Sequence, residues 1–227
     1  MHILAVDTTG IACSAAVLSE GAIRCETYMN AGRTHSQTLG PMIDFCLSSA
    51  GLFIRDIDLF ACASGPGSFT GLRIGIGMIK GFAHASSKPT VGVNTLDALA
   101  RNAAGTDEIV CPVIDARRKE VYTATYLSGK RITDYRAVPL VDVLSSLKGQ
   151  RVVFLGDGAV NYHDTITAAD AGFRVAHGGI VLQRAGSVGM AALDMFKTGI
   201  SQDAYSLEPF YLRETQAERV LAAKEKR

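Results

Sequence analysis

The chain opens with two short apolar runs that are separated by a polar turn. Residues 3–6 are apolar, residues 7–10 read Asp-Thr-Thr-Gly, and a second run over residues 14–18 is apolar after Ser14. Short apolar runs on either side of turn residues are typical of a β-hairpin. The pattern predicts two strands with an acidic residue, Asp7, at the tip, although the same four residues are also ordinary turn formers.

A similar pattern returns in the second half of the chain. Residues 110–114 are apolar, Asp115 and further polar residues follow, and residues 120–127 form a second β-type run. We interpret Asp115 as the counterpart of Asp7, with a chance match as the alternative because strand-turn-strand patterns are common. Two such hairpins suggest an α/β fold of the actin-like ATPase (ASKHA, ribonuclease-H-like) type, a duplicated fold whose two lobes clamp nucleotide phosphates between hairpin tips.

Between the hairpins the apolar positions follow a helical period. Leu39, Ile43 and Cys46 share one helix face, and Thr34 and Gln37 have capping-box spacing, which predicts a helix over residues 35–50. The same reasoning predicts further elements, namely strands over 58–64, 90–93 and 152–155, helices over 70–85, 95–103, 141–147 and 185–196, and a turn at 156–158. We expect an N-terminal lobe over 1–105, which contains the helices over 35–50 and 70–85 considered below for partner binding, and a C-terminal lobe over 106–206. A segment over 207–227, including a charged helical tail, is expected to pack back on the first lobe.

A glycine-rich loop joins the strand predicted over 58–64 to the next helix. The free N–H groups at the start of a helix can bind an anion, but the loop matches neither the P-loop nor the dinucleotide fingerprint. A tight turn that needs glycine is the other explanation for this loop. At the tip of the second hairpin, Arg117 and Arg118 could reach an anion, and a solvated turn is the alternative. The candidate contacts to a nucleotide or anion are Asp7, Thr8, Thr9, Gly65, Gly67, Ser68, Asp115, Arg117 and Arg118.

The helix predicted over 70–85 contains Gly71, Gly75, Gly77 and Gly81. Each internal glycine costs about 0.5–1 kcal/mol relative to alanine, and close helix packing would offset that cost. The neighbour could lie inside the chain or on another protein. The residues predicted to bind a partner on this helix and the preceding one are His35, Leu39, Met42, Ile43, Phe45, Cys46, Phe69, Leu72, Gly75, Ile76 and Ile79.

Composition narrows the functional classes. The net charge of +1, from 23 Lys plus Arg against 22 Asp plus Glu, provides no basic excess for tight direct binding of RNA. The 5 cysteines form an odd number without C-x-x-C spacing, which favours reduced, buried thiols and a cytoplasmic location. With no charged leader and no apolar run of membrane-spanning length, we expect no membrane association.

Three segments resemble the bacterial TsaB (also called YeaZ) family. They are Gly-Pro-Gly-Ser-Phe-Thr-Gly-Leu-Arg at 65–73, Asp-Ala-Arg-Arg-Lys-Glu-Val-Tyr at 115–122 and Pro-Phe-Tyr-Leu-Arg at 209–213. The resemblance runs through almost the whole chain and is strongest over residues 1–125. It implies a non-catalytic subunit that is required for threonylcarbamoylation of N6 of adenosine 37 in transfer RNAs reading ANN codons.

The resemblance also implies partners. Members of the family pair with and activate a catalytic paralogue, TsaD, and a small ATPase, TsaE, joins the pair. Pairing in the family uses the two helices that match residues 35–50 and 70–85 here. Transfer RNA is then contacted only through the complex, and an unpartnered apolar face favours a homodimer when the subunit is alone.

A departure from the catalytic paralogue concerns its metal site. The paralogue carries Val-Asn-His-x-x-x-His, with two histidines as metal ligands, whereas this chain has Thr95 and Leu99 at those positions. The resemblance therefore implies no metal, no cofactor and no catalytic residue, and the sequence contains no nucleophile elbow. The rival hypothesis is a free-standing ATP-dependent phosphotransferase or ATPase that uses Asp7 and Asp115.

Overall fold

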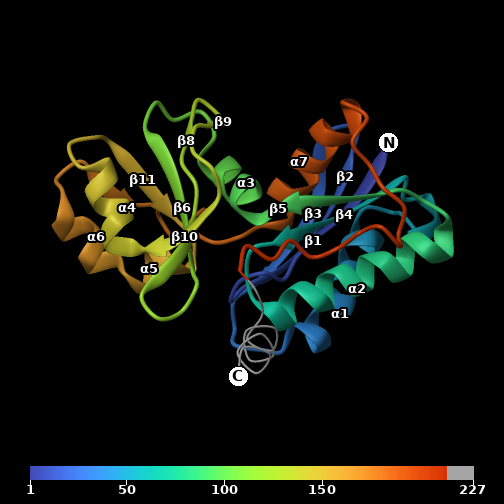
Figure 1. The fold of residues 1–227 in the computed structure, drawn as a ribbon. Helices are drawn as coiled ribbons and strands as arrows, with labels where there is room; N and C mark the ends of the chain where they lie inside the picture. Colours follow the sequence, from blue (N-terminus) through green and yellow to red (C-terminus); the bar gives the residue numbers. More distant parts are fainter. Residues whose placement is uncertain (214–227) are drawn as a thin grey trace, which may run out of the picture.

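The first lobe is built on a mixed sheet of order β3-β2-β1-β4-β5. The computed structural model describes residues 1–213, so the tail expected to be helical lies outside the described residues (Figure 1). β1 pairs antiparallel with β2 and parallel with β4, and β4 is parallel to β5, which brings the carboxyl ends of β1, β4 and β5 to one edge. The strands are β1 His2–Asp7, β2 Cys13–Ser19, β3 Ala22–Met29, β4 Leu59–Gly65 and β5 Thr90–Asn94.

The second lobe repeats this arrangement. Its sheet has the order β10-β7-β6-β11-β12, and β6 is antiparallel to β7 and parallel to β11, as β1 is to β2 and β4. The predicted duplicated fold is confirmed, with Asp7 and Asp115 ending equivalent strands. The strands are β6 Ile109–Asp115, β7 Glu120–Thr123, β8 Tyr126–Leu127, β9 Lys130–Arg131, β10 Arg136–Pro139, β11 Val152–Leu155 and β12 Phe173–Val175, with β8 paired to β6 and β9.

The helices expected over 35–50, 70–85, 141–147 and 185–196 form within a residue of their bounds, whereas the one expected over 95–103 ends at Ala100 and continues as a 3₁₀ turn. The helices are α1 His35–Ser49, α2 Phe69–Ser86, α3 Thr95–Ala100, α4 Leu140–Leu147, α5 Asp157–Asn161, α6 His163–Ala169 and α7 Ala185–Lys197, with 3₁₀ turns at Ile54–Asp56 and Arg101–Ala103. Two expectations are corrected. The Thr34 side chain makes no capping bond, and the turn expected at 156–158 is the start of α5, with Gly156 before its first residue. β3 was not predicted, because none of its residues is fully buried and they lack a clear apolar alternation.

Helix α7 belongs to the second half of the sequence but packs on the first sheet. It covers the face opposite α1 and α2, where Val188 and Ala192 pack with Ala5 and Leu18 (Figure 1). We expected the second lobe to span residues 106–206. Helix α7 lies in that span but packs on the sheet of the first lobe, so the packing does not follow a single division at residue 105.

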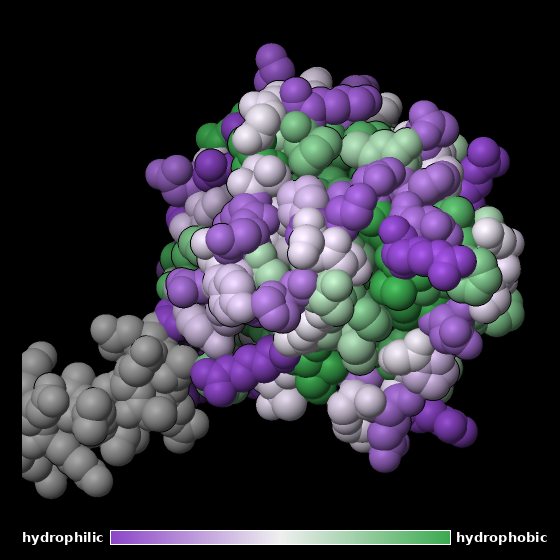
Figure 2. Space-filling model, turned by 90° about the vertical axis from the view of Figure 1, so that its right-hand side faces the viewer, coloured by the Kyte–Doolittle hydropathy of each residue, from purple (hydrophilic) through white to green (hydrophobic). Residues whose placement is uncertain are grey.

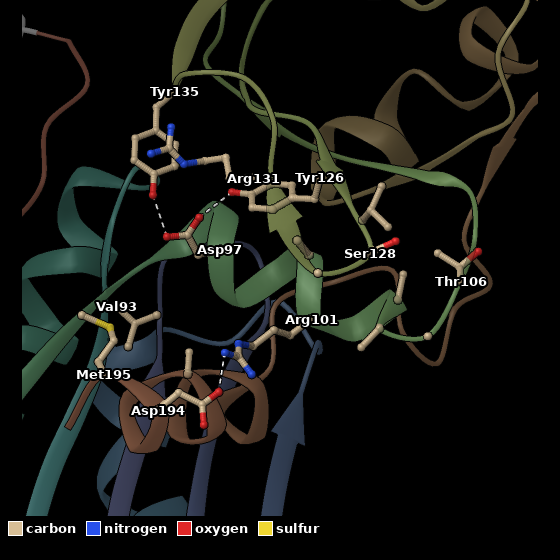
Figure 3. Close-up of a pocket in the computed structure, with 17 residues that line it drawn as sticks. Val93, Asp97, Arg101, Thr106, Tyr126, Ser128, Arg131, Tyr135, Asp194 and Met195 are labelled. Carbon is tan, nitrogen blue, oxygen red and sulfur yellow. Dashed lines mark hydrogen bonds and ion pairs between the residues drawn. The ribbon is translucent and has the colours of Figure 1, made fainter. Parts of the chain in front are cut away.

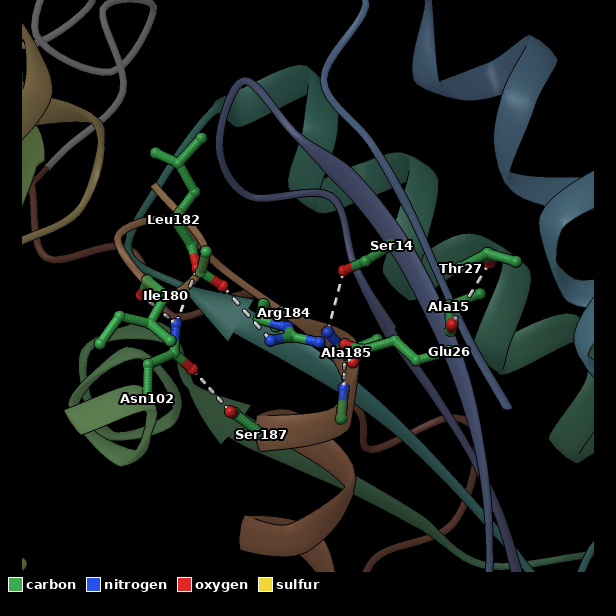
Figure 4. Close-up of polar contacts among 12 residues, drawn as sticks. Ser14, Ala15, Glu26, Thr27, Asn102, Ile180, Leu182, Arg184, Ala185 and Ser187 are labelled. Carbon is green, nitrogen blue, oxygen red and sulfur yellow. Dashed lines mark hydrogen bonds and ion pairs between the residues drawn. The ribbon is translucent and has the colours of Figure 1, made fainter. Parts of the chain in front are cut away.

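Polar contacts fix the start of α7 to the first lobe (Figure 4). The Glu26 carboxylate of β3 accepts hydrogen bonds from the Arg184 guanidinium at 2.5 Å and the Gly186 N–H at 2.9 Å. In the same turn, the hydroxyl group of the next residue, Ser187, donates to the Asn102 amide oxygen at 2.6 Å. The carboxylate thus satisfies a free N–H group of the first helical turn and a cation at once.

The segment over residues 201–213, here termed the C-terminal strap, touches both lobes. The Phe210 N–H donates to the Ser64 carbonyl in the first lobe at 2.7 Å, while Arg213 forms an ion pair with Glu120 in the second. Its described part therefore packs against β4 and bridges the lobes.

The cysteine side chains lie mostly in the interior of the fold. Cys13, Cys46, Cys62 and Cys111 are buried, Cys25 is half-buried, and none is in a disulfide. In the described part of the chain, no helix combines the length and the apolar character that crossing a bilayer requires.

Replacing Glu26 by alanine should destabilise the protein. The change leaves the Arg184 guanidinium and the Gly186 N–H without their acceptor, at a cost of about 2 kcal/mol. For a chain of this size that corresponds to a fall in Tm of about 4–8 °C, measurable by thermal unfolding. The matched control is Glu208→Ala, which removes an exposed glutamate and should leave Tm unchanged; an equal effect of both changes would contradict the assigned role of Glu26.

Candidate functional site

The two hairpin tips and the glycine-rich loop enclose a cleft of about 460 Å³. Its lining includes Thr9, Gly67 and Ser68 from the first lobe and Asp115 and Arg117 from the second. Residues predicted from separate segments are therefore brought to one place between the lobes.

Asp7 lies beneath this cleft and does not line it. Its side chain is 1 % exposed, and one carboxylate oxygen accepts bonds from the Thr9 N–H at 2.9 Å and the Thr9 hydroxyl at 2.7 Å. The other oxygen has no hydrogen-bond partner. Burial raises the pKa of Asp7 to about 6, against the lowering effect of the Thr9 bonds. The carboxylate shapes the first hairpin turn at a cost in desolvation.

The second tip is more open. Asp115 accepts a bond from the Arg117 N–H at 2.8 Å, and its own N–H donates to Asp157 at 3.2 Å. Burial raises the pKa of Asp157. Arg117 and Arg118 are exposed with φ of 65° and 55°, in the left-handed region, so this turn presents its cations to solvent at the rim of the cleft.

The glycine-rich loop is packed against protein on both sides. The Ser68 N–H donates to the Thr9 carbonyl at 2.7 Å, so that amide is not free for an anion. A Cβ atom at Gly67 would lie 2.5 Å from the Thr9 oxygen, and one at Gly65, where φ is 125°, would lie 2.3 Å from the Phe210 oxygen. Close backbone approach accounts for both glycines, as the tight-turn explanation expects.

The glycines inside α2 divide into two kinds. A Cβ atom at Gly71 would lie 2.0 Å from the Thr8 carbonyl oxygen, and one at Gly75 would lie 2.4 Å from the Thr8 hydroxyl. Gly77 and Gly81 are exposed and have nothing within 4 Å of a Cβ position. The first pair serves an internal contact with the hairpin turn, and the second pair leaves a shallow outer helix face.

The two positions that the resemblance sets against the paralogue's metal ligands carry side chains unsuited to a metal. Thr95 and Leu99 are 0 % and 1 % exposed, and Leu99 packs in the core of the second lobe. A hydroxyl and an aliphatic group do not replace two imidazoles. Over residues 1–213 there is no group of three or more His, Cys, Asp or Glu that could hold a metal ion.

Most residues predicted to bind a partner are core residues. This corrects the expectation for Leu39, Met42, Ile43, Cys46, Leu72, Ile76 and Ile79, which pack on the first sheet. The helical period identified the apolar face that packs on the sheet, and this buried face is not available to a partner. Gly75 likewise faces Thr8. His35 is half-buried, with a ring nitrogen 2.9 Å from the Gly10 carbonyl oxygen, while Phe45 and Phe69 are 59 % and 42 % exposed.

Exposed hydrophobic side chains do occur beside these helices. Tyr28, Met29, Pro41 and Phe45 line a depression of about 520 Å³ between β3 and α1. The surface of the first lobe seen in Figure 2 shows hydrophobic patches among hydrophilic residues. Sequence reasoning missed Tyr28 and Met29 because β3 was not predicted; the β-forming residues Ile23, Thr27 and Tyr28 were the available signal.

The fold and the paired hairpin tips define a member of the actin-like ATPase fold class. The activator of the 2-hydroxyisocaproyl-CoA dehydratase from Clostridium difficile shares the fold, with a TM-score of 0.56 at 11 % identity over 88 % of this chain and 97 % of that one. The YeaZ structure from Pseudomonas aeruginosa superposes with a TM-score of 0.77 at 28 % identity, covering 93 % of this chain and 99 % of that one.

Sequence comparison gives the family. The chain is 33 % identical to the tRNA threonylcarbamoyladenosine biosynthesis protein TsaB of Escherichia coli K12, over 99 % of this chain and the full length of that protein. A family model described as TsaD, tRNA N6-adenosine threonylcarbamoyltransferase, matches residues 29–219. The chain belongs to the TsaB (YeaZ) family, whose members are named for tRNA threonylcarbamoyladenosine biosynthesis.

Alanine at Gly71 and at Gly77 should have opposite effects on stability. At Gly71 the added methyl group meets the Thr8 backbone, which cannot move as a side chain does, and the expected loss is about 1–3 kcal/mol. At Gly77 the methyl group meets open space, and the better helix propensity of alanine adds about 0.5–1 kcal/mol. Urea unfolding of the two variants measures both; a stabilising Gly71→Ala would show that the hairpin contact is not tight.

Asparagine at Asp7 should stabilise the protein at neutral pH. Because the folded-state pKa of about 6 lies above the ordinary value of 3.8, folding binds a proton between these values, and stability falls as pH rises through them. The penalty of about 2–3 kcal/mol is complete above that window. Chemical unfolding of Asp7→Asn should therefore show a gain at pH 7 that vanishes below about pH 4. Asp142→Asn, an exposed control, should show no gain at either pH.

Proposed function

We propose that this chain is a non-catalytic subunit that pairs with and activates a TsaD-type catalytic paralogue in the threonylcarbamoylation of N6 of adenosine 37 in transfer RNAs reading ANN codons. Full-length similarity to TsaB and the match to the TsaD family model support a shared ancestry with the catalytic subunit. The observation that carries the non-catalytic role is the pair Thr95 and Leu99 at the ligand positions, both buried.

Pairing through α1 and α2 is supported by their outer faces. Phe45 exposes 59 % of its side chain, beside a depression lined by Pro41 and Tyr28. On α2 the open positions Gly77 and Gly81 let a second helix approach closely. We propose that these exposed residues form the contact, in place of the buried stripe that periodicity selected.

The remaining partners follow from the same assignment. A TsaE-type ATPase joins the pair, and transfer RNA meets this subunit only within the complex, in keeping with a net charge of +1. When the chain is alone, its exposed helix faces pair with a second copy and form a homodimer. The paralogue then competes with that second copy. A cytoplasmic location accompanies this role.

Arginine at Gly77 should abolish pairing while leaving the fold intact. The side chain has space in the free subunit, but it blocks helix approach and brings a charge into the contact. Co-purification with the paralogue should be lost, and transfer activity should fall to that of the paralogue alone, with the thermal unfolding of the variant unchanged. The matched control is Val141→Arg, at an exposed valine of α4 in the second lobe. Pairing retained by Gly77→Arg, or lost equally in the control, would contradict the proposed surface.

The rival function, a free-standing ATPase or phosphotransferase, rests on the cleft between the hairpin tips. Its lining contains Asp115 and Asp157, the type of residues that hold magnesium phosphate. Calorimetry with ATP and magnesium separates the two functions. Low-micromolar binding with turnover by the isolated chain would favour the rival, and Asp115→Asn should then abolish it.

A further inference from the structure

A second cavity lies between the lobes, away from the hairpin tips and away from the outer faces of α1 and α2. Its volume is about 420 Å³, within the range of about 300–1,000 Å³ typical of small-molecule sites. Helices α3 and α7 form one side and the β8–β9 hairpin forms the other (Figure 3). Small side chains keep the space open, namely those of Ala100, Ala103, Ala104 and Ala191.

The carboxylate of Asp97 faces this cavity without a cationic partner. Its two oxygens accept one hydrogen bond each, from the Tyr126 and Tyr135 hydroxyl groups, both at 2.6 Å. Over residues 1–213 it takes part in no ion pair. Burial and the Asp97 charge raise the pKa of Tyr126 and of Tyr135, so both hydroxyl groups stay protonated as donors. A carboxylate can accept about four hydrogen bonds, which leaves lone pairs open to a ligand.

Two guanidinium groups also line the cavity. Arg101 stands four residues after Asp97 but pairs with Asp194 of α7 at 2.7 Å, through one nitrogen. Arg131 stacks on the Tyr135 ring, 4.1 Å from its centroid, and uses one nitrogen for the Thr133 carbonyl and Asp134. Each guanidinium therefore retains N–H donors that can bind an anionic group.

The charges select against singly charged ligands. An anion would be attracted by Arg101 and Arg131 but repelled by Asp97 and Asp194. A simple cation would be attracted by the two carboxylates but repelled by the two guanidinium groups. A molecule that carries both a protonated amine and a carboxylate satisfies both sets of groups.

We propose that this cavity is a binding site for a small zwitterion of the α-amino-acid class, with its ammonium group on Asp97 and its carboxylate on Arg101 and Arg131. Because the walls come from both lobes, an occupied site favours the lobe arrangement that brings these groups together. The site is separate from the proposed pairing surface and goes beyond the proposed function.

Titration of the isolated, ¹⁵N-labelled full chain with L-alanine, L-threonine, L-glutamate and L-lysine tests this proposal by two-dimensional NMR. We expect saturable shifts with at least one amino acid at millimolar concentration, and none with acetate or ethylamine, which carry one charge each. Asp97→Asn and Arg101→Gln should each weaken binding at least tenfold. Asp142→Asn, on the exposed face of α4, should not.

Arg101→Gln leaves the bonds between Asp97 and the two tyrosines in place, so it tests the site even where Asp97→Asn alters the fold. The absence of saturable shifts with every amino acid would overturn the proposal, as would binding that survives both substitutions or binding of acetate alone with equal affinity. These readings use the isolated chain, so they are independent of pairing with the paralogue.

Discussion

The close contact between α2 and the first hairpin turn is the constraint on which the first lobe depends. Gly67, Gly71 and Gly75 follow one another at four-residue spacing, and each lies where a Cβ atom would clash with Thr8 or Thr9. Hydrogen bonds reinforce the contact, since the Thr8 hydroxyl donates to the Gly71 carbonyl at 2.7 Å. With the helix backbone seated on the turn, the direction of α2 is fixed relative to β1. The same contact sets which face of the helix remains outside.

The sequence was sufficient for the fold class and for most elements, because hydrophobic periodicity and turn residues are local signals. The two hairpins and helices α1, α2 and α7 were predicted close to their observed bounds. The packing of α7 on the first sheet could not be predicted from the sequence, because it brings together residues that are far apart in the chain. The partner surface was misjudged for Leu39 and Ile79 for a related reason: an apolar stripe shows that a face is covered, and the covering element here is the chain's own sheet.

Polar groups that lower stability gather where the carboxyl ends of the strands of the first sheet meet the second lobe. Asp7 and Thr95 follow from β1 and β5, and each has a buried oxygen without a partner. Gln183, 1 % exposed and next to Gly10, has both amide atoms unpartnered. Buried polar atoms without partners are uncommon and concentrate at sites that fold stability alone does not explain. This edge therefore carries more buried polarity than the packing of the sheet requires.

The position of α7 has a consequence for how the protein is made. The first sheet is complete in sequence by Asn94, but the face formed by Ala5, Ala16 and Leu18 stays uncovered until residues 185–197 have left the ribosome. Contacts between such distant segments slow folding, because a long loop must close before they form. The nascent amino-terminal half thus emerges with an apolar surface that α7 covers only later, and such transiently exposed surface is what chaperones bind during synthesis.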